Sequence, residues 1–537
     1  MERPRNRKAF LGDIGVHLIG PGENGTGVSL EGTDVNDKAE ELSKQWFMNI
    51  VASDKMSLKR TLPDVRAPIC KQQMFEDSLP LASVVIVFYN EWLSVLLRTI
   101  QSVLTRTSPD LLHEIVLFDD CSNRTELIES LQIFIAQWSR KVRLVRSKQR
   151  LGLIQARVQA AKMAAAETIV FLDSHSEVTI GWLEPLLQRI KQKPYGIVIP
   201  KIDGINSKDM AYSFAGIRDR MIGGFRWTLF FKWDHPPRLS SSNPAIPLRT
   251  PTIPGGIFAM DRRNFIHSGG YDEGMQIWGA ENLELSFRTW MCGGSIEFML
   301  CSHVGHVQKS ANPHYNNENY AYNSARIAEV WLGKYKRLFY NYRQTLKKAK
   351  IGNLAARIEL RDRLGCHSFG YFLKTIYPQK FVPDEGMLAW GYIKDNSGAN
   401  LCLDTMQRDE RYPIKVGLYR CQEGESFAQL FSWTQNRSIR REDTCLLFPD
   451  RDPGKVLLVQ CRDDVPPDAN MIWDHVKSST IVHQASGLCL DMSKLAEGDD
   501  VFVAKCDAKS KYQRWSFQHY SEAVEDNDER KGEKFTH

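Results

Sequence analysis

The sequence of 537 residues contains no run approaching the roughly 18 apolar residues that a membrane-spanning helix needs. Its first ten residues are basic and lack the apolar core of a signal peptide, which taken alone predicts a cytosolic protein. The sequence also has no Cys-x-x-Cys pair, no Gly-x-Gly-x-x-Gly fingerprint and no Walker loop. Zinc ribbons, nicotinamide cofactors and P-loop nucleotide sites are therefore disfavoured.

Neither sign of charge is in large excess. The net charge of +6 arises from 70 basic and 64 acidic side chains, and no basic run is interleaved with aromatic residues. A nucleic-acid partner is therefore not indicated. Hydrophobic content of 42% and charged content of 25% are typical of globular proteins. A chain of this length exceeds one ordinary core, so we expect two or three domains.

The eleven cysteines argue against a cytosolic protein. The last six form three pairs with similar short separations, which predicts one loop-closing disulfide in each of three repeats: Cys402 with Cys421, Cys445 with Cys461, and Cys489 with Cys506. Sequons at Asn24, Asn123 and Asn436 are compatible with a secretory route. We therefore expect that the full product carries an N-terminal anchor that this sequence lacks.

The most informative stretch is Ile169–Glu177, in which four apolar residues lead into Asp173-Ser174-His175. Such a run predicts a buried strand of a parallel sheet, and ligands of such sheets bind beyond the carboxyl ends of the strands. Asp173 and His175 are two apart in an extended segment and should point the same way. A carboxylate and an imidazole suit Mn²⁺ or Mg²⁺ with phosphate oxygens. The alternative is a strand end followed by a polar turn without a metal.

The order of the preceding segments predicts an α/β domain. Residues 1–75 have the composition of a stem that wraps onto the next domain. Predicted strands then alternate with predicted helices up to the Ala-rich helix 152–166: strands 83–91, 114–122 and 142–145, and helices 92–104 and 127–138. This order predicts a parallel, doubly wound sheet, which brings Asp120 and Asp173 to neighbouring strand ends.

Three blocks beyond residue 182 carry further candidates. Residues 250–258 predict a close backbone approach to a ligand, because two glycines lie among prolines. Glu281 begins a predicted helix, where an acidic residue is often only a cap. His303 and His306 follow a predicted strand, and a second histidine near the predicted metal strengthens that site.

Four of these blocks resemble the signature blocks of the polypeptide N-acetylgalactosaminyltransferases, in the same order: residues 173–175, 254–258, 278–288 and 304–306. The resemblance extends from about Pro68 to the end of the third repeat. It implies a GT-A catalytic domain, a Rossmann-like α/β fold with a mostly parallel sheet, over residues 76–365. It also implies Mn²⁺-dependent, retaining transfer of GalNAc from UDP-GalNAc to Ser or Thr of protein or glycopeptide acceptors. That reaction initiates mucin-type O-glycosylation in the Golgi lumen, where the family's members are type II membrane proteins.

The resemblance also implies roles for individual residues. Asp173, His175 and His306 match the family's manganese ligands. The other matched positions lie around the nucleotide, the sugar and the reacting bond; Trp278 and Glu281 are the catalytic candidates, and the substrate-binding candidates are Asp120, Arg150, Ser174, Gly255, Gly256 and Tyr315. Two catalytic-domain disulfides are implied, Cys70 with Cys301 and Cys292 with Cys366, which leaves Cys121 unpaired.

A linker at residues 366–385 leads to a second domain at 386–520, followed by a charged tail at 521–537. Three units recur in the second domain, at 400–404, 443–447 and 487–491, and their ends recur 42 residues apart. This period predicts a repeat fold and resembles the all-β ricin-type β-trefoil lectin that the family carries. Asp404 and Tyr419 of the first repeat are the candidate sugar readers, whereas Leu447 stands at the equivalent place in the second. A trefoil retained only for packing is the alternative.

Several positions depart from the family's pattern around the donor, namely Tyr89, Leu151, Pro254, Gln155, Ala280, Gln308 and Lys309. Lys309 keeps a positive charge but loses the planar fork with which arginine grips phosphate. Two functions therefore remain open: an active transferase, or a weak or inactive paralogue that binds glycoproteins through its lectin domain. A GT-A enzyme with another donor is disfavoured because the acceptor-side blocks match too.

Overall fold

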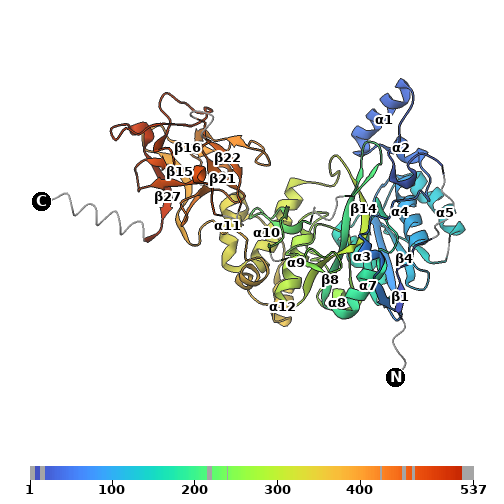
Figure 1. Cartoon of the computed structure of the whole chain (residues 1–537). Helices are drawn as coiled ribbons and strands as arrows, with labels where there is room; N and C mark the ends of the chain where they lie inside the picture. Colours follow the sequence, from blue (N-terminus) through green and yellow to red (C-terminus); the bar gives the residue numbers. More distant parts are fainter. Residues whose placement is uncertain are drawn as a thin grey trace. The chain divides into compact units, whose positions relative to one another are not determined.

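The computed structural model describes residues 6–12, 19–138, 140–214, 220–238, 240–423, 426–449, 455–462 and 466–522 (Figure 1). The chain forms two compact units. One comprises Met1–Lys334 and Lys350–Tyr377, and the other comprises Tyr335–Ala349 and Pro378–His537. Among the described residues, no helix is both long and apolar enough to cross a membrane.

A mixed ten-stranded sheet forms the centre of the first unit. Its main path runs in the order β12 (Leu248–Arg249), β14 (Ser295–Gln308), β8 (Gly196–Asn206), β13 (Phe258–Asp261), β6 (Thr168–Asp173), β3 (Ala82–Phe88), β4 (Leu112–Asp119), β5 (Val142–Arg146). The four strands predicted before residue 173 lie side by side and parallel. β13 is antiparallel to both of its neighbours, a reversal that the Pro- and Gly-rich block before it did not reveal.

The central strands are apolar throughout because both faces of the sheet are covered. All seven residues of β3 are buried, and Ile86, Val116 and Val170 have no exposed surface. The helices predicted between these strands are present as α4 (Leu93–Arg106), α5 (Leu131–Gln137) and α6 (Leu153–Met163). α6 packs against β3 and β4, and α7 (Leu183–Gln192) packs against β8, β13 and β14.

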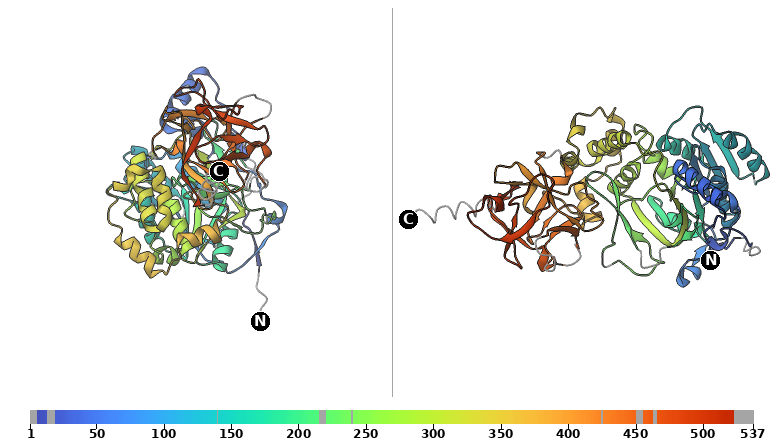
Figure 2. Two further views of the ribbon diagram at one scale, coloured as in Figure 1. Left: turned by 90° about the vertical axis from the view of Figure 1, so that its left-hand side faces the viewer. Right: turned by 90° about the horizontal axis from the view of Figure 1, so that it is seen from above.

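The segment before the sheet is an integral part of this unit. α1 (Thr33–Trp46) and α2 (Ile50–Lys55) lead into an extended stretch, and Figures 1 and 2 show this blue segment lying along the blue-green part of the unit. Met48, Ile50 and Met56 are buried in one cluster with Val95 of α4 and Val307 of β14. The N-terminal segment therefore buries apolar surface against the sheet and α4.

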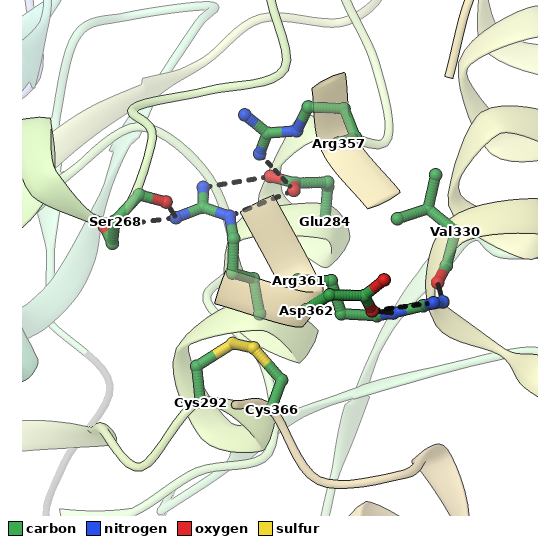
Figure 3. The surroundings of a disulfide bond; sticks show 9 residues. Ser268, Glu284, Cys292, Val330, Arg357, Arg361, Asp362 and Cys366 are labelled. Atoms are coloured by element: carbon green, nitrogen blue, oxygen red, sulfur yellow. Dashed lines mark hydrogen bonds and ion pairs between the residues drawn. A yellow bond between two sulfur atoms is a disulfide. The ribbon is translucent and has the colours of Figure 1, made fainter. Parts of the chain in front are cut away.

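Two disulfides and a buried ion cluster hold the helices of the first unit. Cys70 is joined to Cys301, and Cys292 is joined to Cys366, the pairs that the family resemblance implied. Figure 3 shows the second bond beside Glu284 of α9 (Glu281–Met291). Glu284 accepts hydrogen bonds from Arg288 of the same helix and from Arg357 of α12 (Ala355–Arg363), the latter at 2.6 Å. These contacts fix the helix that begins at Glu281.

The second unit contains three copies of one hairpin, as the repeat period predicted. The hairpins are β16 with β18 (Leu401–Asp404, Gly417–Arg420), β21 with β22 (Thr444–Leu447, Leu457–Gln460) and β25 with β26 (Leu488–Asp491, Phe502–Lys505). Each is closed by one disulfide, in the three pairs predicted from spacing. Phe431, Trp473 and Trp515, one from the end of each repeat, are buried in a common core with aliphatic strand residues. This is the arrangement of a β-trefoil.

Candidate active site

A cavity of about 820 Å³ opens at the carboxyl ends of β3 and β6. Its walls come from those strand ends, the end of β14, the Gly255-Gly256 turn and the loop before α9. The position is the one that open α/β sheets use for ligands, and the volume suits a nucleotide-sized molecule.

Asp173, His175 and His306 lie together in this cavity. One ligand atom from each lies within 4.8 Å of the others, and the two imidazole centroids are 4.7 Å apart. Their meeting follows from the strand pairing. The short strand β7 (Ser176–Val178) runs antiparallel to β14 with Ser176 opposite His306, and the backbone of Val307 donates to the carbonyl oxygen of His175.

Glu91, at the end of β3, supports the metal candidates from behind. Its Oε2 lies 2.8 Å from His175 Nδ1 and accepts a hydrogen bond from Ser174 Oγ at 2.9 Å. Lys309 Nζ contacts both of its oxygens, at 3.0 and 3.1 Å. Burial, together with the charge of Lys309, lowers the pKa of His175 to about 4, so the ring is neutral near pH 7 and its Nε2 is directed to a ligand role.

Arg157 of α6 is the cation of the site floor. It donates to Asp173 Oδ1 at 2.8 Å and lies 3.5 Å from Glu281 Oε1. Gly256 is required beside it, because a Cβ at that position would lie 1.7 Å from Arg157 Nη2 and 2.7 Å from Asp173 Oδ1. Gly255 faces open space instead, with no atom within 4 Å of its ideal Cβ.

Glu281 does more than begin a helix. Its carboxylate is buried and accepts the backbone N–H of Gly279 at 2.8 Å, and burial raises its pKa despite the nearby Arg157. The loop before it is strained: Ile277 and Ala280 have φ values of 39° and 63°, in the left-handed range. Asn323 holds this loop. Its Oδ1 accepts the backbone N–H of Gln276, and its Nδ2 donates to the carbonyl oxygens of Gln276 and Gly279.

The candidates on the nucleotide side form a second cluster. The carboxylate of Asp120 is buried; it accepts the backbone N–H groups of Leu151 and Gly152 at 2.7 and 2.9 Å and pairs with Arg150. Asp120 is not among the residues that line the cavity, whereas Arg150 is. The Arg150 guanidinium lies 3.8 Å from the ring centroid of Tyr89, one of the departures from the family pattern. Asp120 therefore orients Arg150, and Tyr89 forms a cation–π contact with it.

Aromatic side chains form one side of the cavity. The ring centroid of Trp278 lies 6.3 Å from that of Tyr315 and 6.1 Å from that of Tyr320. Tyr320 in turn stacks on Phe230 at 4.3 Å. Trp278 and Tyr315 remain accessible, so this side offers apolar, partly exposed surface to a ligand.

The lectin candidates lie in the first hairpin of the second unit. Asp404 is buried, and its Oδ2 accepts a hydrogen bond from Gln429 Nε2 at 3.0 Å. Tyr419 pairs with Cys402 across the hairpin, on the face that also carries Asp404, and is partly exposed. The third repeat holds Asp491 in the same way through Gln513, at 2.7 Å. In the second repeat, Leu447 and Met471 replace both members of this pair.

Glu91 and Arg157 were not among the residues singled out from the sequence. Glu91 was visible as an acid at the end of a predicted strand, the same signal that identified Asp173. Arg157 carried no such signal, because it lies within an Ala-rich helix and reaches the site only through the packing of α6 on the sheet.

Comparison with known protein families assigns both units. Residues 83–267 match glycosyl transferase family 2, residues 235–310 match the N-terminal domain of galactosyltransferase, and residues 389–515 match the ricin-type beta-trefoil lectin domain. The probable N-acetylgalactosaminyltransferase 9 of Caenorhabditis elegans is 42% identical over 93% of this chain and 86% of its own. Polypeptide N-acetylgalactosaminyltransferase 4 of Mus musculus is 40% identical over 89% of this chain and 84% of its own.

A solved structure has the same architecture. GalNAc-T7, crystallised with UDP, GalNAc and Mn²⁺, is 31% identical to this chain. The alignment covers 97% of each of the two chains, with a TM-score of 0.73. The resemblance seen in the sequence blocks is thus confirmed over nearly the whole chain. This chain belongs to the polypeptide N-acetylgalactosaminyltransferase family, with a GT-A glycosyltransferase unit and a ricin-type lectin unit.

Proposed function

We propose that this chain transfers GalNAc from UDP-GalNAc to Ser and Thr hydroxyls of proteins, with Mn²⁺ held by Asp173, His175 and His306. The observation that carries the proposal is the meeting of one carboxylate and two imidazoles within 4.8 Å in the main cavity. The relatives are GalNAc-transferases, and the GalNAc-T7 structure contains UDP, GalNAc and Mn²⁺.

The residues present fit such an ion. A carboxylate oxygen and imidazole nitrogens are donors that Mn²⁺ accepts, and Glu91 orients His175 in the manner of a carboxylate behind a metal-bound histidine. Asp173 Oδ2 and His306 Nε2 lie 3.3 Å apart, a separation that two ligand atoms of one ion can have. When bound, Mn²⁺ would stabilise the negative charge that develops on the departing diphosphate.

The chain's own cations support the same charge. Arg150 is positioned by Asp120 and Tyr89 at the edge of the cavity, and Lys309 reaches into it from the segment after β14. Both line the cavity that a diphosphate would enter, although each is also paired with a carboxylate, Arg150 with Asp120 and Lys309 with Glu91. Preorganised positive charge at a developing anion is a large contributor to catalysis.

The partners of the cavity carboxylates disfavour a covalent glycosyl-enzyme intermediate. Glu91, Asp173 and Glu281 line the cavity, and each is held by a cation within 3.5 Å. A carboxylate engaged in this way is a poor nucleophile. Orientation of the acceptor hydroxyl and stabilisation of the leaving group would then supply most of the acceleration. The retention that the family resemblance implies would require attack from the side on which UDP departs.

We assign the acceptor side to Trp278 and Tyr315, whose neighbouring rings line the cavity. Asp404 and Tyr419 would read GalNAc already present on a glycoprotein. Five disulfides favour an oxidising compartment, which supports action in the Golgi lumen and initiation of mucin-type glycosylation there.

Transfer from UDP-GalNAc to a mixed set of Ser and Thr peptides, with Mn²⁺ or with chelator, tests this function. We expect Mn²⁺-dependent transfer from UDP-GalNAc and much less from UDP-GlcNAc or UDP-glucose. Absence of transfer with every donor, combined with retained binding of glycopeptides, would instead support the weak or inactive paralogue. That alternative is based on Tyr89, Ala280 and Lys309, which differ from the family's pattern and all line this cavity.

A further inference from the structure

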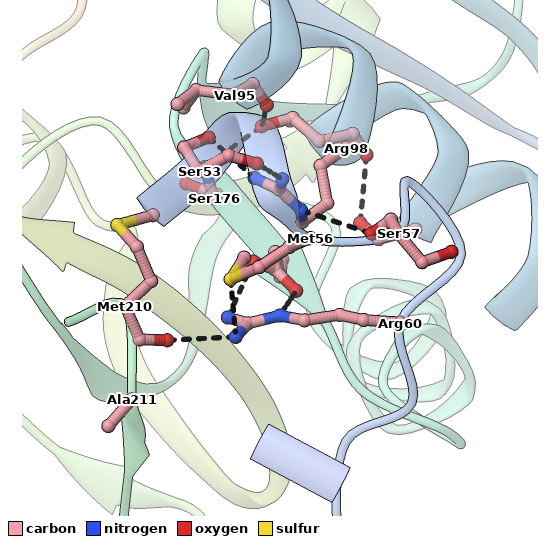
Figure 4. Close-up of polar contacts among 12 residues, drawn as sticks. Ser53, Met56, Ser57, Arg60, Val95, Arg98, Ser176, Met210 and Ala211 are labelled. Carbon is pink, nitrogen blue, oxygen red and sulfur yellow. Dashed lines mark hydrogen bonds and ion pairs between the residues drawn. The ribbon is translucent and has the colours of Figure 1, made fainter. Parts of the chain in front are cut away.

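A buried ion pair connects the N-terminal segment to β7, the short strand that follows His175 and pairs with β14 beside His306. Arg60 has no exposed surface, and it donates to both oxygens of Glu177, from Nε at 2.8 Å and from Nη2 at 2.7 Å. Its remaining nitrogen, Nη1, donates to the carbonyl oxygen of Met210 at 2.8 Å (Figure 4). Arg60 lies outside residues 83–267, which match the glycosyltransferase family.

Glu177 is the middle residue of β7, and β7 sets the position of the metal candidates. In its ladder with β14, Ser176 is opposite His306, Glu177 is opposite Gly305, and the ladder continues to His175 through the bond from Val307. A strand of three residues has few bonds with which to fix its own register. A slip by one residue would turn every side chain to the other face.

The backbone around β7 is held by α4 from the other side. Thr99 Oγ1 donates to the carbonyl oxygen of Ser174 at 3.0 Å and accepts the N–H of Ser176 at 3.1 Å. Arg106 donates to the carbonyl oxygen of Val178 at 2.7 Å. These bonds hold the main chain at each end of β7, whereas the side chain of Glu177 is hydrogen-bonded, among the described residues, by Arg60.

The segment that carries Arg60 is itself fixed to α4. Arg98 donates to the carbonyl oxygen of Ser53 at 2.6 Å, to its Oγ at 3.1 Å and to the carbonyl oxygen of Ser57 at 3.4 Å (Figure 4). Arg106 also bonds the carbonyl oxygen of Arg60. Arg60 therefore projects from a backbone held at several points, and its planar fork can define the position of the Glu177 carboxylate.

We propose that Arg60 is a positioning residue of the metal site: by pinning Glu177 it fixes the register of β7 on β14 and thereby the separation of His175 and His306. The proposal rests on the proposed metal site, and it makes the N-terminal segment part of the catalytic apparatus. Arg60 is not among the residues that line the cavity, so it acts through Glu177.

The test compares Arg60→Met with Arg66→Met in the full chain. Arg66 is a matched control, because it is a buried arginine of the same segment whose side chain bonds Asp64 rather than β7. Mn²⁺ affinity in the presence of UDP is measured by electron paramagnetic resonance of free Mn²⁺, and thermal unfolding is followed in parallel. We expect Arg60→Met to weaken Mn²⁺ binding about 10- to 100-fold, as loss of a residue behind a metal ligand does. Arg66→Met should lower the melting temperature without moving Mn²⁺ affinity.

Arg60→Lys keeps the charge without the fork and should recover part of the loss. If Arg60→Met does not accumulate in folded form, the same comparison is made between Arg60→Lys and Arg66→Lys. We then expect a smaller loss of Mn²⁺ affinity in Arg60→Lys and none in Arg66→Lys. Wild-type Mn²⁺ affinity in a folded Arg60→Met or Arg60→Lys, or equal losses in the Arg60 and Arg66 variants, overturns the proposal. If wild-type protein binds UDP with no dependence on Mn²⁺, the metal site itself is wrong, a result distinct from failure of the positioning role alone.

Discussion

Gly256 and Gly255 are neighbours at which one added methyl group should have very different effects on stability and UDP affinity. In Gly256→Ala the new Cβ would lie 1.7 Å from Arg157 Nη2 and 2.5 Å from its Cζ. Arg157 is buried and cannot move without loosening its bond to Asp173. Overpacking costs about 1–3 kcal/mol, and breaking a buried ion pair about 3–5 kcal/mol. We expect a loss of roughly 2–4 kcal/mol in the free energy of unfolding and, because Asp173 shifts, at least about 10-fold in Mn²⁺-dependent UDP affinity.

Gly255→Ala supplies the control. Its Cβ would meet no atom within 4 Å and its φ lies outside the left-handed range, so stability should change by less than about 0.5 kcal/mol. The methyl group would project into the cavity, so the KM for UDP-GalNAc should rise while UDP affinity with Mn²⁺ is kept. Urea unfolding and calorimetric titration of both variants decide the matter. Wild-type UDP affinity in Gly256→Ala, or equal destabilisation by the two substitutions, would refute the geometry of the site floor.

Three further predictions concern other parts of the molecule. Burial alone would raise the pKa of Glu284, but Arg288 and Arg357 lower it from 4.5 to about 2. The ionised carboxylate therefore contributes roughly 3 kcal/mol to the free energy of unfolding above pH 4.5, and this contribution is lost as the pH falls toward 2. Glu284→Gln should flatten that part of a stability–pH curve. Glu91→Gln should weaken Mn²⁺ binding about 10-fold without loss of secondary structure by circular dichroism, since His175 loses its charged partner. Asp404→His should abolish any preference for a peptide that already carries a distant GalNAc; a preference that survives would show that the first repeat is not the reader.

Local sequence patterns predicted the half of the catalytic sheet in which each strand is a continuous apolar run. The run before Asp173 has to be buried on both faces, and a strand of that kind leaves its polar residues only at its end. The antiparallel strand β13 was missed because it follows the Pro- and Gly-rich block at 250–258, whose composition indicates a turn. Only its pairing with β6 and β8 makes it a strand.

The candidate site divides in the same way. Asp173 and His175 were accessible from local pattern, and His306 from the resemblance of its block. Arg157, which lines the cavity, and Arg60, which bonds Glu177 behind it, were not, because each lies in a segment whose own sequence shows no reason for a buried charge. Buried ion pairs are properties of tertiary packing, and a single sequence does not display the partner.

The metal assignment is tested most directly by calorimetric titration of UDP into wild-type protein, Asp173→Ala and His306→Ala, each with Mn²⁺ and with chelator. We predict Mn²⁺-dependent UDP binding by the wild type and its loss in both variants, with circular dichroism spectra unchanged. Unchanged UDP affinity in both variants would contradict the placement of the metal at Asp173, His175 and His306.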